Sequence, residues 1–150
     1  MPTNILRNRS IKAPARQAKS EADARRPPRR ILIRAGRVSI HIKLLDTKTA
    51  DRVWLALPIH STAETWGRAI HFETPVETGR ERGARSISEA GDICFWSEDD
   101  RVIIGFGPTP LSRAGEIRLP RPCNVWAKAE DDVALLKAVV PGEKVSMTAA

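Results

Sequence analysis

Hydrophobic and polar residues alternate over residues 38–44, where every second side chain is aliphatic. A period of two is typical of a strand with one buried face, so this segment is predicted to be a half-buried strand with His41 on its polar side. Ile31 and Ile33 predict a shorter strand before it. Ala35 and Gly36 suit a tight connection, because glycine accepts positive φ. Residues 31–44 are therefore expected to form a hairpin.

The period then changes to that of a helix. Apolar residues fall at Ala50, Val53, Trp54 and Leu57, which places them on one helical face. Thr47 or Thr49 can cap the start, and Pro58 disfavours helical backbone at the residue before it. A short amphipathic helix ending near Leu57 is predicted, with Trp54 as a core residue.

Later segments also show strand patterns. Residues 61–76 predict one or two strands bent at Gly67, and residues 77–90 lack periodicity and are expected to form a mobile loop. Residues 91–107 predict a hairpin around the acidic turn 97–100, with Gly105 and Gly107 leaving one strand face bare. Bare glycine positions admit a close approach by another chain segment or by a ligand.

The last segments complete the fold prediction. Residues 116–128 are extended, but Pro120 and Pro122 are expected to confine that part to an edge or a turn. Asp131 or Asp132 can cap a short helix over residues 133–140, and residues 143–148 predict a final strand. Many short strands with two short α-helices indicate a mostly β fold, either a closed barrel or a sandwich.

Charge divides the chain into two parts. Residues 1–30 carry nine Lys or Arg and two acids, which gives +7, and residues 31–150 carry sixteen of each sign. The first part is rich in proline and poor in large apolar residues, so it is predicted to be a disordered basic extension of a single domain at 31–150. It could act as a nucleic-acid arm, a solvated extension or a transit peptide.

Candidate chemistry in the body is sparse. No apolar run approaches the roughly 20 residues that span a bilayer, so a cytoplasmic protein without a membrane partner is expected. Cys94 and Cys123 have no CxxC neighbour and are interpreted as small core residues. His71 and Glu73 share a strand face without a third ligand, so no metal site is predicted. No glycine-rich phosphate loop is present, and no cofactor is expected.

Five segments occur in an order that resembles a known family. They are ADRVWLALP, TWGRAIHFETPV, GDICFWSEDDRVIIGFGPTP, EIRLPRPCNVWAKAED and LLKAVVPGEKV. Together they are similar to the small bacterial and archaeal proteins described as cyclophilin-like, over about residues 31–148. The resemblance implies a closed β-barrel of about eight strands, with short helices covering its ends, in a family largely without assigned activity.

The resemblance does not extend to the isomerase motifs of true cyclophilins. Their F-H-R and Q-G-G-D segments are absent, and Ala69 stands where an acidic residue is usual in the family. Prolyl isomerisation still needs only an apolar pocket and a donor that weakens amide resonance. Arg101 and Arg113 are the arginines nearest the signature segment, and surface charge is the alternative interpretation of both.

Aromatic residues gather in or near the same segments, which predicts a concave site that binds a small molecule or peptide. Filling the barrel core is the alternative role for each of them. A component of an amide-hydrolysing system is a further alternative, although the neighbours His60 and Ser61 should point apart on a strand. The candidate ligand-binding residues are Trp66, Phe72, Phe95, Trp96, Phe106, Thr109, Glu116 and Asn124.

Overall fold

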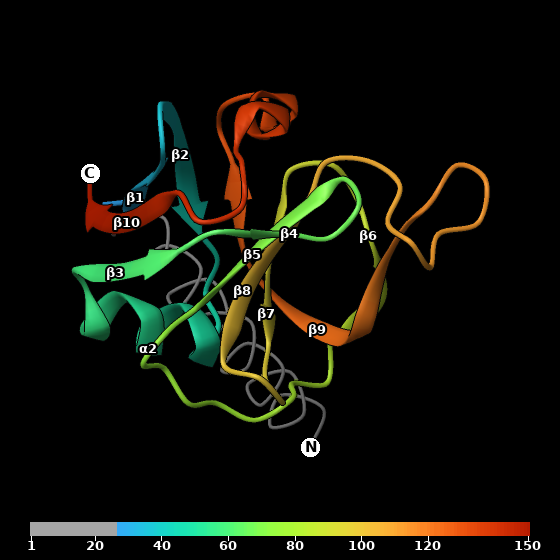
Figure 1. Cartoon of the computed structure of the whole chain (residues 1–150). Coiled ribbons are helices and arrows are strands. Elements are labelled where there is room, and N and C mark those ends of the chain that lie inside the picture. Colours follow the sequence, from blue (N-terminus) through green and yellow to red (C-terminus); the bar gives the residue numbers. More distant parts are fainter. Residues whose placement is uncertain (1–26) are drawn as a thin grey trace, which may run out of the picture.

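The computed structural model describes residues 27–150, which form one antiparallel β-barrel (Figure 1). The predicted basic extension lies almost wholly outside these residues. Arg29 and Arg30 belong to the folded body, because Arg29 pairs with Asp51 at 2.8 Å and Arg30 with Glu130 at 2.8 Å. Both arginines therefore contact the barrel, and Arg30 is the first residue of its first strand.

The sheet contains ten strands, and its order is β3-β10-β1-β2-β9-β7-β8-β5-β4, with β6 paired to β9 beside this path. The strands are β1 (Arg30–Ala35), β2 (Val38–Leu44), β3 (Ile59–Thr62), β4 (Glu64–Thr65), β5 (Ala69–Glu73), β6 (Arg85–Ser88), β7 (Asp92–Trp96), β8 (Arg101–Gly105), β9 (Ile117–Ala129) and β10 (Lys144–Ala149). The predicted mostly β barrel is confirmed.

The two ends of this order are neighbours in the chain. Only Ala63 separates β3 from β4, and Figure 1 shows β3 leading directly into β4. The Ala63 amide bonds to the Glu143 carbonyl at 2.8 Å, which holds β3 on β10, while β4 pairs with β5. One bent segment therefore brings the sheet round into a nearly closed barrel.

The first hairpin and helix follow the sequence closely. In the β1–β2 hairpin Ala35 faces Val38, so the turn residues are Gly36 and Arg37, one position later than predicted, and Gly36 has a φ of 59°. Helix α2 (Lys48–Ala56) is capped by Thr47, whose side chain accepts from the Ala50 amide at 3.0 Å.

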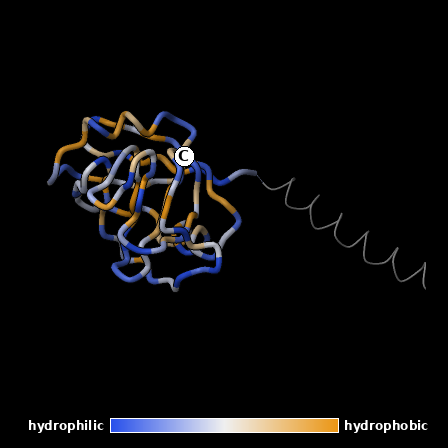
Figure 2. Tube along the Cα trace, turned by 90° about the vertical axis from the view of Figure 1, so that its right-hand side faces the viewer, coloured by the Kyte–Doolittle hydropathy of each residue, from blue (hydrophilic) through white to orange (hydrophobic). Residues whose placement is uncertain are grey.

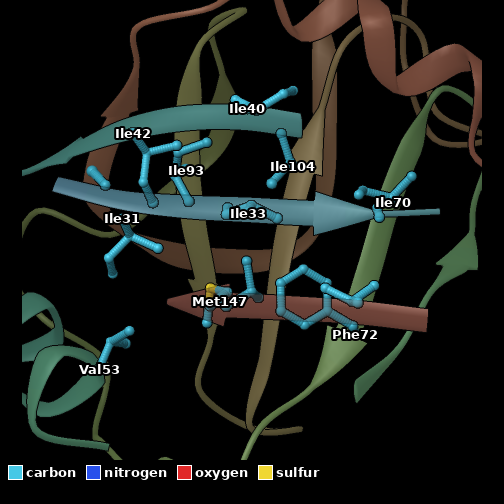
Figure 3. Packing of buried hydrophobic residues seen from close by; sticks show 14 of the residues in the cluster. Ile31, Ile33, Ile40, Ile42, Val53, Ile70, Phe72, Ile93, Ile104 and Met147 are labelled. Carbon is cyan, nitrogen blue, oxygen red and sulfur yellow. The ribbon is translucent and has the colours of Figure 1, made fainter. Parts of the chain in front are cut away.

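The main core fills the barrel interior. Side chains from β1, β2, β5, β7, β8 and β10 converge there, and Val53 joins them from α2 (Figure 3). Figure 2 shows hydrophobic and hydrophilic stretches interleaved along the folded chain, with several hydrophilic stretches at its periphery. The largest fully buried side chains are Trp126, Phe72 and Phe95. Trp54 packs partly buried against this core.

Three predictions about the later segments need correction. The charged segment 77–90, expected to be only a mobile loop, contains β6, whose one large apolar residue, Ile87, is 41% exposed. Strand β9 runs unbroken through Pro120 and Pro122, so the predicted interruption is absent, although this part of β9 pairs with β6 alone and has the predicted edge position. The register with β6 shifts at the prolines, and the ladder needs no amide there. The last helix, Val133–Ala138, is a 3₁₀-helix capped by Asp132.

Candidate functional site

A hollow of about 220 Å³ lies on the outer face of the barrel, and we call it the tryptophan pocket. On β5 and β8, residues of the main core alternate with residues of the opposite face, so Phe72 points inward and His71 outward. The pocket is lined by Glu64, Trp66, His71, Trp96, Asp99, Arg101, Ile103 and Pro120.

A small second core supports the floor of this pocket. It consists of five buried residues on the outer face, Ala69, Cys94, Ile103, Leu119 and Cys123, and we call it the outer cluster. Trp66 and Trp96 pack against the outer cluster and are each partly exposed. The outer cluster therefore holds each indole in place, and the exposed part of each indole is accessible to a ligand.

A tight turn positions Trp66. Its amide bonds to the Ala69 carbonyl at 2.9 Å, and the Ala69 amide bonds back at 3.1 Å, so Gly67 and Arg68 form a two-residue turn. Gly67 has a φ of 57°, and a Cβ built on it would lie 2.9 Å from the Thr109 Cα. The segment FGPTP thus has a structural role, because its backbone packs against the turn that carries Trp66.

Arg101 is the central charged group of the pocket. Its Nε lies 3.0 Å from the Asp99 carboxylate, and its Nη1 lies 3.4 Å from the Glu64 carboxylate. Nη1 also donates to the Nδ1 of His71 at 3.3 Å. In a neutral ring this Nδ1 can accept the bond, and it also lies 3.7 Å from the Glu64 carboxylate.

The environment of His71 agrees with a neutral ring. Burial lowers the pKa of His71 below its usual value, and the Arg101 guanidinium lowers this pKa further against the opposing carboxylates of Glu64 and Asp99. The imidazole also makes an edge contact with the Trp96 ring, with centroids 6.2 Å apart. His71 therefore presents an uncharged ring to the pocket.

A second hollow of about 370 Å³ adjoins the pocket, and we call it the seam hollow. It lies where β3 departs to β10 while β4 stays on β5, and Glu64 and Arg101 line both hollows. The residues that line it are His60, Ser61, Thr62, Glu64, Glu73, Thr74 and Arg101. These residues are polar or charged, in contrast to the indoles that line the tryptophan pocket.

The barrel wall divides the predicted aromatic site. Trp66 and Trp96 meet in the tryptophan pocket, whereas Phe72 and Phe95 are fully buried in the main core. Phe106 packs partly buried against the same core. The core-filling role thus applies to the three phenylalanines, because neighbours on a strand face opposite sides.

The predicted polar site residues have local structural roles away from the pocket. Thr109 is 6% exposed and donates its hydroxyl to the Arg118 carbonyl at 2.5 Å. Glu116 pairs with Arg118 at 2.8 Å, and this contact lowers the pKa of Glu116. Asn124 is buried. Its side-chain Nδ2 donates to the Gly79 carbonyl, and its Oδ1 accepts from the Glu81 backbone N–H, so it ties segment 77–84 to the barrel.

Four pocket residues were not among the candidate site residues predicted from the sequence: Glu64, Asp99, Ile103 and Pro120. Strand pairing brings the first of these to the site, since Glu64 faces His71 across the β4–β5 ladder. The predicted hairpin around residues 97–100 already implied that Trp96 faces Arg101 and that Asp99 lies nearby. Isolated surface acids follow no periodic pattern, so only this pairing could have identified them.

The remaining candidate residues are also accounted for. Cys94 and Cys123 are buried, as predicted, and burial raises the pKa of both thiols, that of Cys123 to about 12. Within residues 27–150 no cluster of three His, Cys, Asp or Glu side chains is arranged to hold a metal ion. In the same part of the chain, no helix has the length and apolarity needed to cross a membrane.

The glycines of β8 and its continuation accommodate neighbouring side chains. A Cβ on Gly105 would lie 2.3 Å from the Ile117 Cγ2, and one on Gly107 would lie 2.6 Å from the Arg68 Cδ. The close approach expected from the sequence is therefore made by other segments of the protein.

Comparisons with known proteins agree with this architecture. A family model described as cyclophilin-like matches residues 29–148. The chain is similar to a hypothetical protein from Archaeoglobus fulgidus, known from a solution structure, with 31% identity, a TM-score of 0.72, and coverage of 82% of this chain and 95% of that one. It also shares a fold with McbB, solved in complex with tryptophan, at 15% identity and a TM-score of 0.57, covering 79% of this chain and 44% of McbB. No curated protein matches the sequence.

Proposed function

The chain belongs to the cyclophilin-like family, and we propose that it is a binding module that takes the apolar group of a small molecule or peptide into the tryptophan pocket. The observation that carries this proposal is the pair of partly exposed indoles around a preformed hollow. Ligand sites combine an apolar wall with a few placed polar groups, and Glu64, His71 and Arg101 supply these here.

The size of the pocket restricts what it can hold. An apolar cavity of about 150 Å³ accepts a benzene ring, so the 220 Å³ pocket fits one ring or one apolar side chain. A longer ligand would continue into the seam hollow, whose polar lining suits a peptide backbone or a hydrophilic substituent. The two hollows together reach the volume typical of small-molecule sites, about 300–1,000 Å³.

The four tryptophans of the chain provide a direct test. Ring-containing probes and short peptides are titrated while the indole N–H signals are followed by NMR, each assigned from a Trp→Phe variant. We expect the signals of Trp66 and Trp96 to move on binding and that of Trp126 in the barrel interior to stay. Trp66→Ala should abolish binding, whereas Trp54→Phe, outside the pocket, should keep it. Saturating probes that leave both pocket indoles unmoved would refute the proposal.

Prolyl isomerisation is a second candidate because Arg101 lies among the pocket aromatics. Its side chain is 19% exposed, so it could donate in a partly desolvated site, although its carboxylate partners compete for the guanidinium. Arg113 is exposed and lines neither hollow. An isomerase assay should therefore lose its rate in Arg101→Ala and keep it in Arg113→Ala. A wild-type rate at background would remove this candidate.

The alternative of a hydrolase component gains no support from the described residues. His60 is exposed and Ser61 partly buried on β3, and no hydrogen bond joins their side chains in residues 27–150. A serine nucleophile needs a base within hydrogen-bond reach. The pair therefore lines the seam hollow as two separate polar groups.

A further inference from the structure

The charges around the two hollows are unbalanced. Three carboxylates, those of Glu64, Glu73 and Asp99, line the tryptophan pocket or the seam hollow, and Arg101 is the one Lys or Arg among their lining residues. Residues 31–150 as a whole carry equal numbers of acidic and basic side chains. The local excess of negative charge is therefore a property of this site.

Arg101, the one Lys or Arg that lines the two hollows, already has charged partners. Arg101 contacts Asp99 and Glu64, and it faces Glu73 directly across the β5–β8 ladder. It also contacts the Nδ1 of His71, which lies 3.7 Å from the Glu64 carboxylate, and burial lowers the pKa of this histidine, which disfavours a positive charge on the ring. Glu73 is exposed and has no ion-pair partner among residues 27–150. An incoming anion would meet a neutralised arginine and uncompensated carboxylates.

The tryptophan side chains that line the pocket also favour a cationic ligand over an anionic one. The faces of tryptophan rings attract cations, and a carboxylate beside them adds to the attraction in a partly desolvated hollow. Glu64 lines both hollows, so a charged group at the mouth of the tryptophan pocket would lie beside it. Resting on the proposed binding function, we infer that the ligand carries a protonated nitrogen next to its apolar group, as in an aryl-alkyl amine or a basic peptide side chain.

Three probes with one skeleton test this inference. They are 3-phenylpropylamine, 3-phenylpropanol and 3-phenylpropanoate, which place a positive, a neutral and a negative group on the same ring and linker. Binding is measured with the wild-type chain at low salt through the Trp66 indole signal. We expect the amine to bind about 5- to 20-fold more tightly than the alcohol, and the carboxylate most weakly. Raising the salt concentration should reduce the preference for the amine.

Two carboxylate variants test whether Glu64 and Glu73 cause the preference for the amine. Glu64→Gln and Glu73→Gln should each reduce the amine-to-alcohol ratio about 2- to 5-fold. Glu89→Gln is the matched control, because Glu89 is exposed and lines neither hollow, and it should leave the ratio unchanged. A free lysine or arginine amide and a tripeptide centred on the same residue then distinguish a small amine from a peptide ligand.

The outcomes separate this inference from the binding function. Equal affinity for the three probes, or a preference for the carboxylate, overturns the inference and leaves the pocket as a binding site. A preference for the amine that survives both carboxylate variants overturns it as well. If none of the probes moves the Trp66 signal, the inference is overturned, and the broader peptide and ring panel then decides the binding function separately.

Discussion

Replacing Gly67 by alanine tests how the Trp66 turn is built. With a φ of 57°, the backbone of Gly67 lies in the left-handed region, which costs an L-residue about 1–2 kcal/mol. The new Cβ would also lie 2.8 Å from the Pro110 Cδ, 2.9 Å from the Thr109 Cα and 3.0 Å from the Pro108 carbonyl oxygen. Two of these three atoms are backbone, so they cannot rotate away.

The expected loss follows from these two effects. Forcing a methyl group against atoms this close costs about 1–3 kcal/mol, so Gly67→Ala should lower the free energy of unfolding by about 2–5 kcal/mol in total. At about 2–4 °C per kcal/mol for a domain of this size, the Tm should fall by roughly 10 °C. Chemical and thermal unfolding followed by circular dichroism measure both quantities.

Gly115→Ala is the matched control, because Gly115 has a φ of 80° and no atom within 4 Å of the added Cβ. It should show the conformational cost alone, about 1–2 kcal/mol. The reasoning would be refuted if Gly67→Ala were no more destabilising than Gly115→Ala. Such a result would mean that segment 107–110 moves freely and does not position the turn.

Two further predictions concern titratable side chains on the outer face. Because the pKa of His71 is lowered in the folded chain, the unfolded chain binds this proton at a higher pH than the folded chain does. The stability that His71 contributes is therefore complete above about pH 6.5 and is lost as the pH falls below it. Urea unfolding from about pH 5 to 8 should show a smaller loss of stability at low pH in His71→Gln than in the wild type, and equal curves would contradict the lowered pKa. The raised pKa values of Cys94 and Cys123 predict that a thiol reagent at pH 8 labels neither cysteine in the native chain and both in urea, whereas rapid native labelling would exclude buried thiols.

The first half of the fold was accessible from sequence because local patterns there agree with burial. Alternation over residues 38–44 predicted β2, and the buried residues Ala50 and Val53 occupy the face that the helical period indicated. The Gly67 bend was also predicted, since glycine is the residue that adopts positive φ without strain. Each of these predictions needs only neighbours in the chain.

Strand β6 and the continuity of β9 could not be predicted in the same way. The residues of β6, RSIS, hold one large apolar side chain, so their extended form comes from pairing with β9 rather than from a buried face. In β9 the two prolines suggested an interruption, but the bulge opposite them removes the need for their missing amides. Both features depend on a partner strand distant in sequence.

The candidate site was predicted in part, for a related reason. Aromatic composition indicated a site near Trp66 and Trp96, yet it did not separate these indoles from Phe72 and Phe95 on the other side of the wall. Strict alternation at Phe95 and Trp96 already required opposite faces. The acids that accompany the indoles come from β4 and a turn, where pairing alone decides position.

The bent segment around Ala63 also bears on how the protein behaves at high concentration. An open sheet offers two long unpaired margins that template intermolecular stacking and aggregation. Here the terminal strands of the sheet order are β3, with four residues, and β4, with two, and both belong to one continuous stretch of chain. Along β3 and β4, neighbouring molecules thus find little exposed backbone on which to assemble.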